Sequence, residues 1–421
     1  MTTSRPIPRV LRLFLVVDLA LLAVASTCEL ISRFVLHLGD PYNSPLLHEY
    51  FPDVVDMRPR YDFYHSLRFF TDTQHPPCMY PATTAALYKL LYLFRPYDLA
   101  AFFVIALAIA LSAAILFTRE LVRRGLNQTQ AIALMVTVVA TSFPLWYELK
   151  QANIEIVVWL ILTFGLWCFF RDPGLTGGTG YAAAACFGIA AAMKVYPLFY
   201  LALFLPGRPL RQSAKALATG ATAALAVSIP AQWLEYPNLL ESWRLSSQQM
   251  ASYRYIISLK QLLNAGFDHS IFGLIKASFR HRLPPVQTLD HILTVYMVVA
   301  AIAVALVWFF RIRHLPVINQ VLCLSVLTIV LPPTSFDYSL LHLYPAWALL
   351  TLLALAPTAN ERPTPGLTAA FVCLAVLFAP ESELILHSHV YGGPLKCLTL
   401  IALCFIALRY SFGENRLPQA Q

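Results

Sequence analysis

Two carboxylates lie in a polar, aromatic-rich stretch near the start of the chain, at Asp62 and Asp72 within residues 60–80. The stretch is too polar to cross a bilayer, so we expect it to face water. A carboxylate in such a loop can accept the proton of an attacking hydroxyl and so act as a general base. The pattern therefore indicates a catalytic loop, although spacing alone does not separate the two aspartates.

A second long polar segment carries the opposite charge. Residues 37–80 hold six acidic and three basic residues, whereas residues 236–288 hold two acidic and six basic residues. Cations can bind a lipid-linked phosphate and stabilise it as it leaves. An equally open interpretation is that both segments are merely solvated surface. The candidate phosphate ligands, which the sequence does not rank, are Arg244, Arg254, Lys260, Arg280 and Arg282.

The composition is that of a polytopic membrane protein. Of the 421 residues, 58% are hydrophobic and only 12% are charged, against about 25% charged residues in soluble domains. The mean hydropathy is +0.63. The formal net charge of +8 comes mostly from basic residues in short loops between apolar runs, which is the positive-inside pattern. Nucleic acid is therefore excluded as a partner.

Basic residues between the apolar runs orient these runs in the membrane. Arg9 and Arg12 place the N-terminus in the cytoplasm, so residues 37–80 and 234–288 become long extracytoplasmic loops, and we expect interfacial helices in them. Residues 82–94 are too short to span and are also expected at the interface. The alternation returns the C-terminus to the cytoplasm. The expected spans are residues 10–36, 98–117, 129–148, 153–170, 212–233, 289–310, 317–332, 338–356, 366–380 and 394–410.

The apolar run over residues 180–205 is interrupted at Lys194–Pro197, and basic loops flank both of its ends. Proline disfavours helix at the residue before it, and a broken membrane helix is tolerated where it lines a cavity. We therefore predict two half-helices that enter from the cytoplasmic side, which disfavours a direct contact between Lys194 and a phosphate. An ammonium at membrane depth costs about 2.5–3.5 kcal/mol, so Lys194 needs a partner such as Glu155, or a polar cavity.

Two further spans begin with polar residues near the external face. Gln151 and Asn153 start one of them, whereas Asp337 and Tyr338 open the other, with His342 one turn farther along. We expect these side chains to line a sugar or acceptor pocket. The structural alternative is that they form hydrogen bonds between helices.

Three short blocks occur in order along the chain. They are Tyr61–Tyr64 followed by Pro76–Pro77 and Tyr80–Pro81; Gln151–Asn153 followed by Gly188–Pro197; and Pro332–Tyr338 followed by Leu343–Pro345. Together they resemble glycosyltransferase family 87, a bacterial polytopic group with a GT-C fold, and in particular its polyprenol-phosphate-mannose-dependent mannosyltransferases. The resemblance covers roughly residues 60–400, and the block around Lys194 is its most specific part.

The resemblance implies an enzyme that takes a sugar from a polyprenyl-phosphate donor at the outer face and transfers it to a hydroxyl of a glycolipid or glycan, with inversion at the anomeric carbon. In such enzymes the aspartate of the first external loop is the base, and Asp62 matches it here. Tyr64 and Asp72 beside it become candidate substrate-binding residues. The chain departs from the family at Phe336, in a block that often has Trp and His, and at Lys150, where the family often has Gly.

The sequence therefore predicts one all-α integral membrane domain over residues 1–421, a GT-C-like bundle of nine to twelve transmembrane helices including the broken pair. We expect it in the plasma membrane, with both termini cytoplasmic and the active site extracytoplasmic. Because no Asp-x-Asp motif occurs, we expect neither an obligatory metal nor a cofactor beyond the lipid-linked sugar. The alternative function is a transporter or flippase of a lipid-linked sugar. A protein of that class is expected to have internal repeats and short loops on both faces of the membrane.

Overall fold

The computed structural model describes eight stretches of the chain, and these are helical apart from one antiparallel ladder of two-residue strands. The predicted all-helical class is confirmed. The described residues form two compact units, the first drawn from residues 1–53, 110–150 and 262–417 and the second from 54–109 and 151–261. A single domain stays a prediction. The described stretches are residues 6–34, 80–235, 238–260, 266–279, 284–356, 365–380, 385–386 and 389–413.

The helices confirm a membrane protein, but not the predicted number of spans. Five helices in the described stretches are long and apolar enough to cross a bilayer, or six if the bent pair α6–α7 is one span. Other predicted spans correspond to helices of 17 residues or fewer, which are shorter than the ~20 residues that a span needs. The five are α1 (Arg9–Phe34), α5 (Asp98–Arg123), α10 (Leu210–Glu235), α13 (Val286–Phe310) and α17 (Gly392–Arg409).

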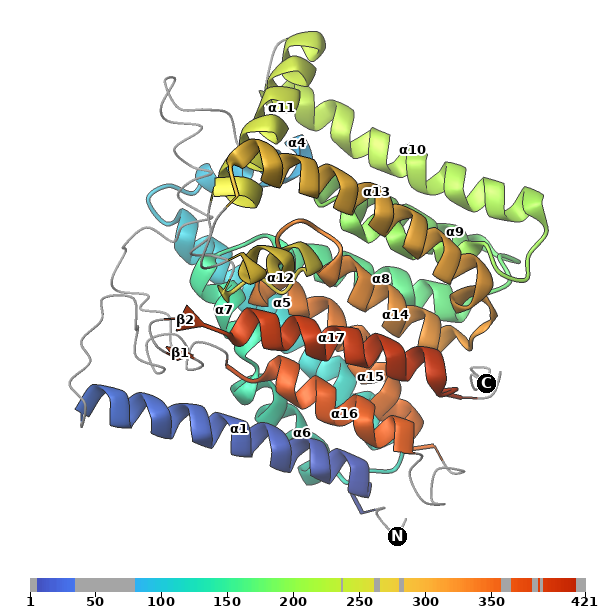
Figure 1. The fold of residues 1–421 in the computed structure, drawn as a ribbon. Helices are drawn as coiled ribbons and strands as arrows, with labels where there is room; N and C mark the ends of the chain where they lie inside the picture. The colour runs from blue at the N-terminus through green and yellow to red at the C-terminus, as the bar shows by residue number, and fades with distance from the viewer. Residues whose placement is uncertain are drawn as a thin grey trace. The chain divides into compact units, whose positions relative to one another are not determined.

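In the first unit, α1 packs against α16, and α16 packs against α17, which also contacts α14 and α12 (Figure 1). Phe14 of α1 is fully buried against Trp347 and Phe371, which shows that the first span is part of the core. The remaining elements of this unit are α6 (Gln128–Thr141), α7 (Phe143–Gln151), α12 (Ile271–Ser278), η4 (Ile312–His314), α14 (Val317–Val330), η5 (Asp337–His342), α15 (Leu343–Ala354), α16 (Pro365–Phe378), β1 (Ile385–Leu386) and β2 (His389–Val390).

The span predicted over residues 129–148 corresponds to two helices, α6 and α7, which are together long and apolar enough for one span but are bent by 51° at a break that the sequence did not predict. Ser142 between them is extended, with φ −68° and ψ 94°. Pro144 explains the bend, since proline lacks an N–H and crowds the carbonyl four residues earlier. The indole Nε1 of Trp146 donates to the carbonyls of Val139 and Ala140 at 3.1 and 3.2 Å, so the helix break leaves these two acceptors bonded.

The span predicted to begin at residue 338 begins instead with a 3₁₀ turn. Residues Asp337–His342 form η5, and the α-helix α15 starts at Leu343. Pro345 cannot donate to the carbonyl of Leu341 and crowds it, which favours the tighter winding before α15.

In the second unit, α9 packs along both α8 and α10 (Figure 1). α9 and α10 approach closely at two glycines, since a Cβ added to Gly188 would lie 2.0 Å from the carbonyl oxygen of Gly220. The helix α4, in the region predicted to be interfacial, packs against α10 through Ala82, Ala86 and Ala231. The other elements of this unit are α4 (Ala82–Tyr92), α8 (Glu155–Arg171), α9 (Gly178–Met193), η1 (Tyr196–Phe204), α11 (Leu239–Tyr253) and the π-helix η2 (Arg254–Lys260).

The predicted break in the run 180–205 is confirmed. α9 ends at Met193, Lys194 is extended with φ −145° and ψ 132°, and a 3₁₀ helix, η1, follows from Tyr196. The segment after the break is therefore not a second α-helix, and Pro197 stands in its first turn.

The Gly188–Gly220 contact yields a stability prediction. Gly188→Ala should lower the thermal unfolding midpoint of the detergent-solubilised protein, because its methyl group meets backbone that cannot rotate away; overpacking of this kind costs about 1–3 kcal/mol. Gly178→Ala in the same helix is the matched control, since a Cβ there meets nothing within 4 Å. Equal midpoints for the two variants would contradict this packing of α9 on α10.

Candidate functional site

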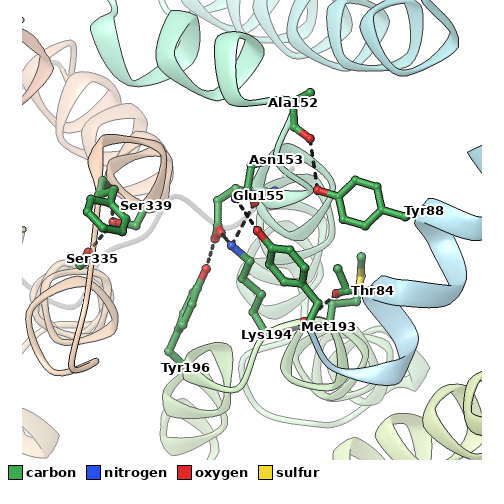
Figure 2. Close-up of polar contacts among 12 residues, drawn as sticks. Thr84, Tyr88, Ala152, Asn153, Glu155, Met193, Lys194, Tyr196, Ser335 and Ser339 are labelled. Atoms are coloured by element: carbon green, nitrogen blue, oxygen red, sulfur yellow. Dashed lines mark hydrogen bonds and ion pairs between the residues drawn. The ribbon is translucent and has the colours of Figure 1, made fainter. Parts of the chain in front are cut away.

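The second unit holds a buried polar cluster centred on Lys194. The Nζ of Lys194 forms an ion pair with Glu155 and donates to the Oδ1 of Asn153 at 3.0 Å. The Tyr196 hydroxyl donates to the other oxygen of Glu155 (Figure 2). The Glu155 side chain is fully buried, and that of Lys194 is 10% exposed. The pairing of Lys194 with Glu155, raised from the sequence, is therefore present.

Local backbone geometry brings these side chains together. Ala152 has a left-handed φ of 49°, which turns the chain between α7 and α8, and its carbonyl accepts a hydrogen bond from Tyr88 at 3.1 Å (Figure 2). Asn153, which precedes the N-cap residue Ile154 of α8, then accepts from the backbone N–H of Glu155 at 3.1 Å, as in an Asx turn. On the opposite side, the carbonyl of Met193 accepts from Thr84 at 2.7 Å, which fixes the end of α9 beside α4.

Tyr80, which precedes α4 in the chain, also belongs to this cluster. Its hydroxyl accepts from the Nδ2 of Asn153 at 3.0 Å, and its ring lies 5.6 Å from the Nζ of Lys194, within cation–π range. Counted over the described residues, the cluster has one positive and one negative charge, which balance. Gln151, also predicted from the sequence, is the half-buried last residue of α7.

The first unit holds a second buried cluster, centred on Asp337 of η5. Asp337 forms an ion pair with Lys396 of α17, and its other oxygen lies 3.7 Å from the Nε2 of His269. Beside them, Asp268 lies 3.2 Å from the Nζ of Lys276. All five side chains are at least 96% buried. Among the residues that the structure describes, two carboxylates and two ammonium groups balance here when His269 carries no charge.

Burial holds His269 in its neutral form. Desolvation lowers the pKa of His269 to about 4, an effect to which the charge of Lys396 adds and which Asp337 and Asp268 oppose. The imidazole is therefore uncharged at physiological pH, and its contact with Asp337 is not an ion pair.

Backbone hydrogen bonds tie the two polar segments of this cluster. The Oδ1 of Asp268 accepts from the N–H groups of Ser270 and Ser335 at 2.9 and 3.0 Å, and the N–H of His269 donates to the carbonyl of Ser335 at 2.8 Å. Ser335 and Ser339 share a hydroxyl hydrogen bond of 2.6 Å (Figure 2). The segment that opens η5 is thus held by residues 268–270.

The other two residues predicted on this span lie beside the cluster in sequence. Tyr338 stacks on Tyr147, with ring centroids 6.1 Å apart and planes inclined by 18°. His342 is fully buried at the end of η5. The structure places Asp337 and His342 inside the first unit rather than on an open surface.

Sequence reasoning missed four members of the second cluster, namely Asp268, His269, Lys276 and Lys396. One signal was available. Lys396 lies within the apolar run 394–410, whose other cation, Arg409, is at its end, and a cation at membrane depth requires a partner. Asp268 and Lys276 belong to the basic segment 236–288, which the sequence predicts to be an extracytoplasmic loop. Nothing in the sequence distinguishes them from surface residues.

Several predicted residues lie outside the described part of the chain. These are Asp62, Tyr64, Asp72, Arg280 and Arg282, and the side chain of Lys260 is likewise not described. Arg254 is half-buried at the start of η2. Among the described residues, no group of three His, Cys, Asp or Glu side chains is placed to hold a metal ion; the expected independence from metal stays a prediction.

The apolar helices and the buried, paired charges define a polytopic membrane protein. Comparison with protein families then matches residues 79–333, more than half of the chain, to glycosyltransferase family 87. The chain belongs to this family and is a glycosyltransferase, as its resemblance predicted. Neither the curated proteins nor the solved structures gave a match. The matched region includes the Lys194 cluster but begins after Asp62 and ends before Asp337.

The Lys194–Glu155 pair yields a second prediction. Lys194→Met should lower the free energy of unfolding by about 3–5 kcal/mol, because it removes the counter-charge of a fully buried carboxylate. Adding Glu155→Gln should recover part of that loss, since both charges are then gone. Lys215→Met, at an exposed position of α10, should change stability by no more than about 0.5 kcal/mol. Denaturant unfolding in detergent measures all four proteins, and an undisturbed Lys194→Met would contradict the pairing.

His269 yields a pH prediction. Its pKa is about 4 in the folded protein against an ordinary 6.5, so between these values the unfolded chain binds a proton that the folded chain does not. Stability therefore falls as the pH falls through this window. His269→Asn removes this titration and should show a shallower loss of stability on acidification. His314→Asn, at an exposed position, is the control and should follow the wild type; identical profiles for all three proteins would refute a neutral buried His269.

Proposed function

We propose that this glycosyltransferase moves a hexose, with mannose the first candidate, from a polyprenyl-phosphate donor to a hydroxyl of a glycolipid or glycan. The family match and the membrane-spanning helices support this proposal together. An enzyme built largely within a bilayer can receive a donor whose lipid tail is already dissolved there. The expected setting is the extracytoplasmic face of the plasma membrane.

In this proposal Asp62 is the general base. Its carboxylate takes the proton of the acceptor hydroxyl, whose oxygen attacks the anomeric carbon from the side opposite the phosphate. The bond between that carbon and the phosphate oxygen breaks, and the electron pair leaves with the lipid phosphate. A single displacement of this kind inverts the anomeric configuration. Tyr64 and Asp72, in the same loop, are proposed to contact the sugar.

The charge balance of the described clusters bears on how the donor phosphate is bound. Lys194 is neutralised by Glu155, and Lys396 by Asp337, so neither is a spare cation for a phosphate. Arg244 is exposed on α11, in the segment that the sequence marks as basic. We therefore propose that the basic residues of that segment, Arg254 and Lys260 among them, bind the phosphate.

The polar helix starts then have a positioning or sugar-binding role. Gln151 and Asn153 belong to the family-matched region, and Asn153 is held rigidly by Lys194 and Tyr80. We propose that they contact sugar hydroxyls. On the polar segment of the first unit, Tyr338 is proposed to contact the substrate, and the buried Asp337 and His342 are proposed to position that segment. The single observation that carries the proposed function is the family match across the rigid Lys194 cluster.

Transfer by the purified protein tests this proposal. Wild type in detergent, given a labelled polyprenyl-phosphate hexose and a panel of lipid acceptors, should form a labelled glycolipid. Asp62→Asn should reduce the transfer rate by about 10²–10⁴-fold, the usual contribution of a general base, while thermal unfolding shows that the variant is folded. Asp72→Asn is the matched control in the same loop and should retain more activity.

Other outcomes overturn specific parts of the proposal. Full activity in Asp62→Asn removes the base assignment, and loss in Asp72→Asn alone moves the base to that residue. Absence of transfer from every lipid-phosphate donor, together with movement of the donor across liposomes, would favour the flippase, for which the comparisons provide no support.

A further inference from the structure

The first membrane-spanning helix contains an ionisable side chain at its centre. Asp18 lies midway in the apolar segment Arg9–Thr27 and is only 1% exposed. A carboxyl group at such a depth is costly when ionised and is seldom without a role. The proposed glycosyl transfer makes no use of it, so its presence requires a separate account.

The hydroxyl of Thr141, which is the hydrogen-bond partner of Asp18, has too few protons to donate to both of its neighbours. The hydroxyl of Thr141, at the end of α6, lies within hydrogen-bond distance of both the Oδ2 of Asp18 and the carbonyl of Thr137, the latter at 2.9 Å. A hydroxyl has one proton to donate and two lone pairs with which to accept. The carbonyl of Thr137 can only accept. If Thr141 donates to Thr137, the hydrogen bond to Asp18 needs a proton from the carboxyl group.

The surroundings of Asp18 do not compensate a negative charge. Its Oδ1 has no hydrogen-bond partner, and no Lys, Arg or His of the described chain forms an ion pair with it. The buried carboxylates Asp268 and Asp337 differ, since each has an ammonium group beside it. An ionised carboxylate that is buried and unpaired costs far more than a neutral one, and such a group normally binds a proton.

We propose that Asp18 is a proton-binding site that remains protonated at neutral pH, and that its carboxyl group donates the hydrogen bond joining α1 to the end of α6. This joint lies next to the bend between α6 and α7, where Ser142 hydrogen-bonds to the hydroxyl of Tyr344. Removal of the proton would place a bare charge in the joint and separate the two helices. The proposal does not depend on the proposed glycosyl transfer.

Few other titratable groups are near enough to complicate this site. The helices that pack against α1 are α16, α6, α15 and α7. Their titratable side chains are Tyr344 of α15, Cys373 of α16, and Tyr147, Glu148 and Lys150 of α7, whereas α6 carries none. Lys150 is the one cation on these four helices, and no ion pair among the described residues joins it to Asp18, so a proton on Asp18 itself is the available means of neutralisation.

Infrared difference spectroscopy of the full-length protein in detergent tests the proposal at neutral pH. The spectrum of wild type minus Asp18→Asn should contain the C=O band of a protonated carboxylic acid, which is distinct from carboxylate bands and shifts in D₂O. Asp172→Asn is the control. Asp172 accepts four hydrogen bonds from N–H and O–H donors. Burial raises the pKa of its carboxyl, but these hydrogen bonds outweigh burial and lower the pKa below its ordinary value. Its difference spectrum should contain carboxylate bands instead.

A second variant keeps the test decisive if Asp18→Asn does not fold. Thr141→Val removes the hydroxyl but leaves the carboxyl, so the acid band should persist and move in frequency. The proposal also requires that the thermal unfolding midpoint of wild type fall from neutral to alkaline pH more steeply than that of Asp18→Asn, because the folded state holds one more proton than the unfolded chain. A carboxylate band lost in Asp18→Asn, or an acid band unmoved in Thr141→Val, overturns it.

Discussion

The pairing of buried charge is the constraint on which the described structure depends. Lys194 with Glu155, Lys396 with Asp337, and Lys276 with Asp268 are each ion pairs between side chains that are at least 90% buried. Replacing one partner of such a pair leaves the other as an uncompensated buried charge. The free-energy cost of that charge exceeds the stabilisation that the intact pair contributes. Each pair therefore disfavours any arrangement in which its two segments are apart, and this selects the native packing among many apolar alternatives.

Two of these three pairs occur where helices are interrupted. Lys194 stands at the break between α9 and η1, and Asp337 begins the 3₁₀ turn η5. Interrupted backbone in a membrane is tolerated where its polar groups are buried in protein. Prolines cause the interruptions, and the side chains beside them satisfy the polar groups. The same residues thus permit the break and confer the polarity that a catalytic membrane protein requires.

The sequence predicted features that depend on neighbours in the chain. The break at Lys194 followed from Pro197, and the partner Glu155 from the cost of an unpaired ammonium in an apolar run. The bend at Ser142 was missed because residues 129–148 have the composition of a continuous span, and one proline near the middle did not outweigh that pattern. The pair Lys396–Asp337 was missed because its members are 59 residues apart, and a one-dimensional pattern does not specify which helices meet. The catalytic assignment of Asp62 still rests on resemblance.

The 3₁₀ winding of η1 has a consequence for the length of the broken segment. A 3₁₀ helix rises about 2.0 Å per residue, against about 1.5 Å for an α-helix. The nine residues of η1 therefore extend for about 18 Å, whereas the 16 residues of α9 extend for about 24 Å. The lengths of α9 and η1 are therefore more nearly equal than their numbers of residues suggest. The chain covers the length of η1 with fewer residues than an α-helix would need.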